Sequence, residues 1–164
     1  MGRVPPKERL ETVLGVHIAA GTAYLARVDA GGQVVLDGPD RLVPSKHLTD
    51  ATQLRDFADR FAQELRRLST VAVGVVHPRL YSWKYSDAFV RVSLEAAIML
   101  RAAEADVHYA CVKQEAAARA VGVPLPKLSS ALAAKYGISA PPLWSQRCLA
   151  VLAAAAVARG RWND

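Results

Sequence analysis

Three short apolar runs follow one another near the start of the chain, each with the length of a β-strand. Residues 12–20 and 22–29 are rich in β-branched side chains and are separated by Gly21. A Gly-Gly turn signal then leads into a third run at residues 33–37. The short connections predict three antiparallel strands joined by tight turns.

A helical pattern and a buried strand come next. An apolar side chain recurs every three or four residues between Leu54 and Leu68, and Asp50 with Gln53 has the spacing of a capping box. Residues 71–76 then form an unbroken apolar run, as expected of a strand that is covered on both faces. We expect this strand to lie in the centre of the sheet, parallel to the first strand.

The rest of the chain alternates helix and strand. A helix that begins at Ser86 or Asp87 precedes a strand at residues 106–112, and a short helix follows at residues 128–136. The closing segment, residues 144–159, is apolar on nearly every helical face, so we expect it to be packed inside the domain. This order predicts an α/β fold of the RNase H-like kind, a mixed sheet flanked by helices.

Length and composition indicate one folded domain. The 164 residues, 52% of them hydrophobic, are enough to build one core. We place a single RNase H-like domain at residues 12–164 and interpret residues 1–11 as a flexible N-terminal arm, because they are polar and carry two adjacent prolines. Residues 148–158, the longest apolar stretch, are too short to span a bilayer. Cys111 and Cys148 lie in apolar runs, which favours buried, reduced thiols and a cytoplasmic protein without a membrane partner.

The chain is basic, with 21 Lys plus Arg against 15 Asp plus Glu, a formal charge of +6. A positive excess favours polyanionic partners through counterion release. It is also common in small domains that simply need to be soluble, so the placement of the charges must decide between the two interpretations.

The first hairpin, VLGVHIAAGTAYLARV, resembles that of RuvC-type Holliday-junction resolvases. The resemblance implies metal-binding carboxylates in the first strand, after the central strand and in the last helix. This chain has His17 at the first position, Gly74 and His77 at the second, and Gln146 and Arg147 at the third. The resemblance therefore implies that the catalytic acids are missing and that these five residues occupy degenerate active-site positions.

The chain is also similar, over residues 12–122, to a small uncharacterised RNase H-like family. The shared features are the segment LRDF at residues 54–57 with Phe61, a basic loop after the central strand, and LEAA at residues 94–97. The similarity depends on the order of these features, since no single motif is diagnostic. It implies the fold and no particular activity.

Metal chemistry has few candidate residues. Two-metal cleavage of a phosphodiester needs several carboxylates around Mg²⁺ or Mn²⁺, because hard cations prefer oxygen ligands. His17 is either a ligand or, as is more usual within an apolar strand, a core residue. A cluster of His17, His77 and His108 is a second interpretation, without supporting ligand spacing. Glu95 is either a catalytic acid or the helical ion-pair partner of Arg91. We expect no metal and no other cofactor, and Mg²⁺ or Mn²⁺ only in an active nuclease.

Aromatic and basic residues alternate after the central strand. Aromatic rings stack on bases and cations hold phosphates, so the segment is a candidate surface for nucleic acid or a partner protein. A flap packed on the domain is the competing interpretation. The candidate residues are Arg79, Tyr81, Trp83, Lys84, Tyr85 and Arg91.

Three functional hypotheses follow. The first is a non-catalytic RNase H-like module that binds nucleic acid or a nucleic-acid-processing protein. The second is a divergent metal-dependent nuclease of the RuvC type that uses His17, Glu95 and further acids that the sequence does not identify. The third is a purely structural subunit, a homodimer or part of a larger assembly, because a fold does not fix a function.

Overall fold

The computed structural model describes residues 11–44, 51–77 and 84–162. The predicted N-terminal arm, apart from Glu11, and the predicted capping residue Asp50 lie outside these ranges. So do Arg79, Tyr81 and Trp83.

One mixed sheet forms the centre of the described residues. The strands lie in the order β3-β2-β1-β5-β6, and β4 also pairs with β2. β1 and β2 are antiparallel, whereas β1–β5 and β5–β6 are parallel, which confirms the predicted central parallel pair. The strands are β1 (Thr12–Ala19), β2 (Thr22–Asp29), β3 (Val34–Val35), β4 (Arg41–Leu42), β5 (Thr70–Val76) and β6 (His108–Val112).

The first hairpin has the tight turn that the sequence predicts. Ala20 and Gly21 have φ values of 48° and 72°, and two positive φ values are what a type I′ hairpin turn requires. The third strand is shorter than residues 33–37, because only Val34 and Val35 pair with β2. A Gly-Pro pair follows this strand, and the chain returns to β2 as β4, which the sequence pattern did not predict.

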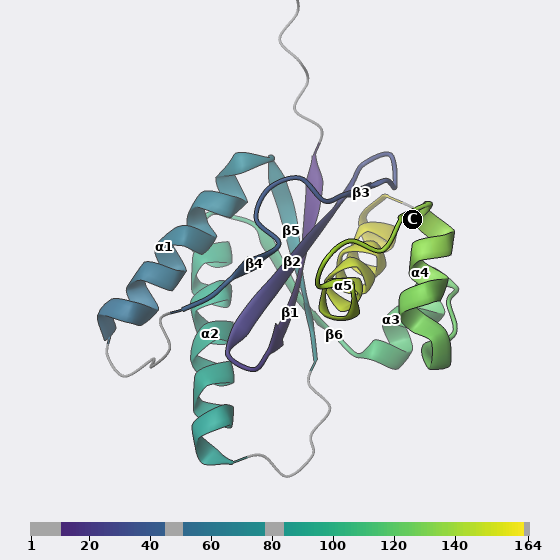
Figure 1. Cartoon of the computed structure of the whole chain (residues 1–164). Helices are drawn as coiled ribbons and strands as arrows, with labels where there is room; N and C mark the ends of the chain where they lie inside the picture. Colours follow the sequence, from purple (N-terminus) through teal and green to yellow (C-terminus); the bar gives the residue numbers. More distant parts are fainter. Residues whose placement is uncertain (1–10, 45–50, 78–83, 163–164) are drawn as a thin grey trace, which may run out of the picture.

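Helices cover both faces of the sheet (Figure 1). α1 and α2 lie on one face and α5 on the other, with α3 and α4 packed beside α5. The helices are α1 (Ala51–Arg67), α2 (Tyr85–Glu104), α3 (Gln114–Val121), α4 (Leu128–Tyr136) and α5 (Trp144–Trp162), with a 3₁₀ turn at Leu125–Lys127.

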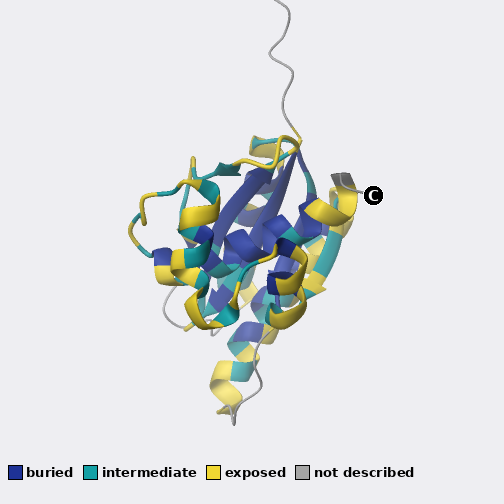
Figure 2. Cartoon of the chain, turned by 90° about the vertical axis from the view of Figure 1, so that its right-hand side faces the viewer, coloured by how far each residue is buried: buried dark blue, intermediate teal, exposed yellow. Residues whose placement is uncertain are grey.

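Successive side chains of a strand point to opposite faces of the sheet, so the strands contribute to two hydrophobic clusters, one on each face. Leu14 and Val16 of β1 pack with Phe57 and Phe61 of α1, while Val13 faces the cluster built around α5. The strands β1, β2 and β5 and the helix α5 are buried along most of their length (Figure 2). The predictions of a doubly covered central strand and an internal closing helix are therefore confirmed.

Two local predictions were wrong. α2 begins at Tyr85 with Lys84 as its N-cap, which makes no side-chain capping bond, so neither Ser86 nor Asp87 caps it. Cys148 is buried as predicted, but Cys111 is exposed because β6 is an edge strand. The sequence could not reveal this edge position, since it depends on which strands pair.

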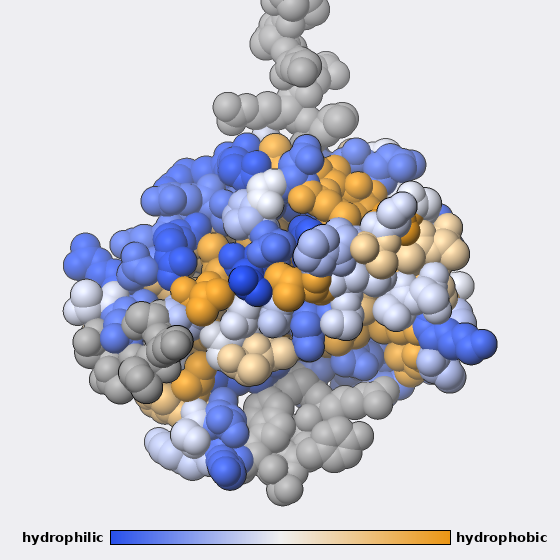
Figure 3. Space-filling view, in the orientation of Figure 1, coloured by the Kyte–Doolittle hydropathy of each residue, from blue (hydrophilic) through white to orange (hydrophobic). Residues whose placement is uncertain are grey.

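The surface is mixed in polarity. In the orientation of Figure 1, apolar residues show as several separate groups among hydrophilic side chains (Figure 3). In the part of the chain that the structure describes, no helix has both the length and the apolarity needed to cross a membrane.

Candidate functional site

α5 approaches the sheet most closely at two glycines. Gly15 of β1 and Gly74 of β5 are register partners in the parallel pair. A Cβ on Gly15 would overlap the carbonyl oxygen of Ala150, and one on Gly74 would lie 2.8 Å from the carbonyl oxygen of Ala153. The backbone of α5 therefore occupies the space above Gly74 that a side chain would need.

His17 lies on the same face of β1, two residues beyond Gly15, and contacts the first turn of α5. Its Nε2 atom is 3.0 Å from Oε1 of Gln146, and its ring stacks on Tyr24 at a centroid distance of 6.3 Å. Burial lowers the pKa of His17 to about 4; the bond to Gln146 opposes this shift and the nearby charge of Arg91 adds to it. Because an amide oxygen can only accept a hydrogen bond, this contact assigns the proton of the neutral ring to Nε2.

Arg91 of α2 forms hydrogen bonds with the C-terminal ends of β1 and β5. Its guanidinium donates to the carbonyl oxygens of Ile18 at 2.5 Å and Val76 at 2.7 Å, and Glu95 lies 3.8 Å away. Burial lowers the pKa of Arg91 and the carboxylate of Glu95 opposes that shift. Arg91 is only 8% exposed. Arg91 is therefore buried and is not an exposed cation of the predicted nucleic-acid or partner surface, which corrects that prediction.

The donor set at this point does not fit a divalent cation. A neutral imidazole already bound to an amide offers no anionic oxygen, and the guanidinium of Arg91 repels positive charge. Among the described residues, no three His, Cys, Asp or Glu side chains converge closely enough to hold a metal ion. The described residues around His17 therefore supply no set of ligands for Mg²⁺ or Mn²⁺.

The predicted histidine cluster does not form. Val76, which precedes His77, pairs with Val112 at one end of β6, whereas His108 lies at the other end, opposite Ala72. Four residues of strand separate the two positions by about 13 Å. His77 and His108 are both exposed.

Glu95 lies beside β6 and is the ion-pair partner of Arg91. The Tyr109 hydroxyl donates to Oε1 of Glu95 at 3.0 Å, and the Cys111 thiol lies 3.8 Å from the same oxygen. The Glu95 carboxylate thus forms an ion pair with Arg91, as the ion-pair interpretation predicts, and accepts a hydrogen bond from Tyr109 of β6.

Arg147 turns away from His17, although it follows Gln146 directly. Its Nε donates to the carbonyl oxygen of Leu25 in β2 at 3.0 Å, and its side chain is buried. Of the predicted aromatic and basic surface, the structure describes Lys84 and Tyr85, both exposed at the start of α2, and the buried Arg91.

Solved structures share this architecture. RuvC from Thermus thermophilus aligns with a TM-score of 0.77 at 17% identity, covering 93% of this chain and 96% of that one. T. thermophilus RuvC in complex with Holliday junction substrate gives a TM-score of 0.76 at 17% identity, over 92% and 95% of the two chains. A yeast mitochondrial Holliday junction resolvase gives 0.60 at 12% identity, over 90% and 77%.

The chain has the RuvC-like RNase H fold. No family model matches the sequence, and no curated protein does. The similarity to a small RNase H-like family therefore stays a prediction, whereas the resemblance to RuvC-type proteins is confirmed at the level of fold.

Positive charge on this RuvC-like fold is concentrated in its C-terminal third. Residues 113–162 contain seven Lys or Arg and one acid, Glu115, so they account for the whole net charge of +6. Arg147 is buried, and the other six cations are exposed. These six are Lys113, Arg119, Lys127, Lys135, Arg159 and Arg161.

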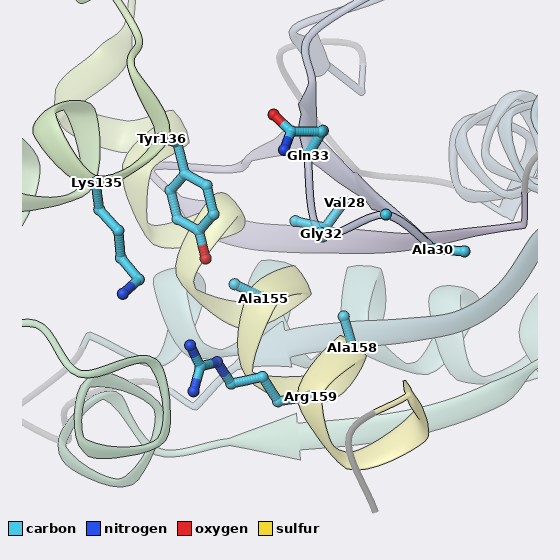
Figure 4. Close-up of a pocket in the computed structure, with 10 residues that line it drawn as sticks. Val28, Ala30, Gly32, Gln33, Lys135, Tyr136, Ala155, Ala158 and Arg159 are labelled. Carbon is cyan, nitrogen blue, oxygen red and sulfur yellow. The ribbon is translucent and has the colours of Figure 1, made fainter.

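A cavity of about 360 Å³ lies within this basic region, between the β2–β3 turn, α4 and α5. Lys135 and Tyr136 reach from α4 toward Arg159 of α5, with Gln33 on the turn opposite (Figure 4). Among the described residues that line it there is no carboxylate. The cavity thus offers two cations and a phenol, which suits an anionic ligand such as a phosphate group.

Sequence reasoning missed this cavity although part of its signal was present. The scarcity of acids after residue 112 is visible in the sequence. The proximity of Gln33 to Arg159 is not, because it depends on how α5 crosses β2.

Proposed function

We propose that this chain is a non-catalytic RuvC-like module that binds nucleic acid. The observation that carries the proposal is the chemistry around His17: Gln146 bonds to its ring, the backbone of α5 lies over Gly74, and the described residues form no cluster of metal-ligating side chains there. Packing and hydrogen bonds thus fill the region instead of leaving it open to a substrate.

The proposed absence of cleavage follows from the lack of negatively charged ligands around His17. Phosphodiester hydrolysis of the two-metal kind needs anionic ligands to hold the ions and to stabilise the attacking and leaving oxygens. Arg91 is fixed by two backbone carbonyls and cannot turn away without leaving both unpaired. The nuclease hypothesis would require a different arrangement of these same side chains.

Nucleic-acid binding is supported by the distribution of positive charge. The exposed cations of residues 113–162 have one acid among them, whereas many arginines of α1 and α2 already face carboxylates, as Arg60 faces Asp56 and Arg101 faces Asp59. Cations without acidic neighbours gain most from phosphate contacts. We assign the backbone contact to this region, with Lys135 and Arg159 at its centre.

The segment from Arg79 to Tyr85 remains a second candidate surface. Lys84 is exposed, while Arg79, Tyr81 and Trp83 lie outside the described residues. Variants of both surfaces, tested side by side, distinguish which of the two binds nucleic acid.

Binding to a four-way DNA junction and to a duplex of equal length, measured by fluorescence anisotropy between 50 and 300 mM salt, tests the proposal. A four-way junction is the first choice because T. thermophilus RuvC has been solved with a Holliday junction substrate. Lys135→Ala with Arg159→Ala should weaken binding and reduce the slope of log K against log salt by about two. Arg55→Ala with Arg66→Ala, an equal change of charge on exposed residues of α1, is the matched control and should leave the slope unchanged.

A variant of the segment from Arg79 to Tyr85 tests whether that second surface makes the DNA contact. If Arg79→Ala with Lys84→Ala reduces the slope and the Lys135 and Arg159 variant does not, our assignment is wrong and the segment after the central strand makes the contact. If wild-type protein binds neither DNA at 50 mM salt, the structural-subunit hypothesis takes precedence.

Cleavage is tested separately. Purified protein should leave both DNAs and a single strand intact in Mg²⁺ or Mn²⁺. Cleavage that His17→Ala abolishes would establish the nuclease hypothesis instead.

A further inference from the structure

The cavity between the β2–β3 turn, α4 and α5 lies far from the residues around His17. Gln146, which contacts His17, is in the first turn of α5, and Arg159, which lines the cavity, follows thirteen residues later in the same helix. At a rise of 1.5 Å per residue, about 20 Å of helix separate the two positions. The residues around His17 therefore do not determine what the cavity binds.

Three hydrogen-bond donors converge on the cavity from two helices. Figure 4 shows the ends of Lys135, Tyr136 and Arg159 turned toward the same part of it. None of the three side chains forms a hydrogen bond or an ion pair with another residue that the structure describes. These donors can therefore bind a ligand without giving up an internal bond.

The hydroxyl of Tyr136 is protonated and can donate. Burial raises the pKa of Tyr136, and the positive charge of Arg159 opposes that rise. The opposing effect means that the phenol and the guanidinium are close enough to act on the same ligand. At neutral pH the cavity thus presents two cations and one neutral O–H donor.

The described residues that line the rest of the cavity carry no negative charge. Val28, Ala155 and Ala158 are buried and form an apolar lining. Asp29 lies next to the turn but does not line the cavity, and its carboxylate accepts a hydrogen bond from the backbone amide of Gln33 at 2.9 Å. The volume of about 360 Å³ is within the range of small-molecule pockets. It leaves room for a phosphate and for part of the group attached to it.

We propose that this cavity binds the terminal phosphate of a phosphate monoester, at the end of a nucleic-acid strand or on a free nucleotide. Where the monoester is a strand end, this rests on the nucleic-acid binding proposed above. A monoester has three terminal oxygens and a charge of about −1.5 to −2 at pH 7, whereas a phosphate within a strand has two free oxygens and a single charge. Three donors with two positive charges match the monoester. The attached sugar then lies against the apolar lining.

Isothermal titration calorimetry with three related compounds tests the requirement for a monoester. Deoxyadenosine 5′-monophosphate should bind, and deoxyadenosine, which has no phosphate, should give no heat of binding. The methyl ester of the monophosphate should bind roughly ten-fold more weakly, because it has lost one acceptor oxygen and most of one charge.

A short single strand distinguishes the two sources of the phosphate. It is prepared with a 5′-phosphate, with a 3′-phosphate or with hydroxyl groups at both ends, and its binding is measured by fluorescence anisotropy. If the strand end is the ligand, one phosphorylated form should bind roughly ten-fold more tightly than the unphosphorylated form. If the free nucleotide is the ligand, the three strands should bind alike while the monophosphate still binds better than its methyl ester.

Substitutions test whether the cavity is the site. Arg159→Gln and Tyr136→Phe should each reduce the affinity for the monophosphate roughly ten-fold, since each removes a donor to a charged oxygen. Arg66→Gln, the same change of charge on an exposed residue of α1, is the matched control and should leave the affinity unchanged. Thermal unfolding of the three variants checks that the fold is kept. Wild-type affinity in both Arg159→Gln and Tyr136→Phe would overturn the assignment to this cavity.

The outcomes separate this proposal from nucleic-acid binding in general. If the four-way junction or the duplex binds, but neither the nucleotide nor the strand shows a preference for the monoester, the cavity proposal is wrong and nucleic-acid binding stands. If the monophosphate binds in preference to its methyl ester while no DNA binds, the cavity proposal stands and the proposed nucleic-acid binding is wrong.

Discussion

Gly15 and Gly74 are register partners in adjacent parallel strands, and each lies directly beneath the backbone of α5. The helix approaches this closely because its own facing residues, among them Ala150, Ala153 and Ala154, are small and buried. The two glycines of the sheet and the alanines of α5 therefore act together, because both are needed for the helix to pack this closely on the sheet. This packing leaves no room for a side chain at position 74, where the resemblance to RuvC-type resolvases implies a carboxylate.

Gly74→Ala should destabilise the protein by about 1–3 kcal/mol, the usual cost of overpacking a filled core. Its Cβ would lie 2.8 Å from the Ala153 oxygen and 2.9 Å from Cγ2 of Val157. Gly160→Ala, in α5 with nothing within 4 Å of its Cβ, should instead stabilise by about 0.5–1 kcal/mol. Urea unfolding of both variants makes the comparison, and equal effects would contradict the close packing.

Acidification should destabilise the protein through His17. Its pKa is about 4 in the folded chain against 6.5 ordinarily, so between these values the unfolded state binds the extra proton. Stability therefore falls as pH falls from 6.5 toward 4, by about 3 kcal/mol from this residue at most. His17→Gln should remove that part of the pH dependence, whereas His108→Gln, at an exposed position, should keep it. Urea unfolding at pH 7 and 4.5 provides the measurement.

His17→Asp should not create a metal site. The introduced carboxylate would lie near the charge of Arg91, which acts on position 17, and would find no second acid at Gly74. We expect neither heat of Mg²⁺ binding by calorimetry at millimolar concentration nor DNA cleavage. A saturable, Mg²⁺-dependent rise in melting temperature would show that one acid is sufficient and that Arg91 does not exclude the ion.

Glu64→Gln should cost about 3 kcal/mol of unfolding free energy, because it leaves the buried charge of Arg27 unbalanced. Arg27 donates to Oε2 of Glu64 at 3.2 Å and to its backbone oxygen at 2.7 Å, with a side-chain exposure of 2%. Asp56→Asn breaks the exposed helical pair with Arg60 and should cost less than about 1 kcal/mol. Thermal unfolding of the two variants distinguishes a buried pair from a surface pair, and similar losses would contradict the difference.

Local patterns in the sequence were sufficient to predict most of the elements and their order, although they missed the short strand β4. The β-branched runs at residues 12–20 and 71–76 became β1 and β5, and the apolar segment after residue 144 became the internal helix α5. Period-two and helical spacings are properties of neighbouring residues, so they can be read without knowing which elements meet. The contact between His17 and Gln146 agrees with the shared site that the resemblance to RuvC-type resolvases implies, and no local spacing could have predicted it.

Only the tertiary structure decided the roles of residues whose environment is built by distant elements. Arg91 has the sequence context of a surface cation, yet it caps two strands from the opposite helical layer. The apolar residues of α2 surround much of the helix, and only the position of α1 and the sheet shows which of them are exposed among the described residues. The exposed ones are Tyr85, Phe89, Val92, Met99 and Leu100. Burial and charge pairing depend on contacts between residues far apart in the chain, and hydrophobic periodicity carries no information about them.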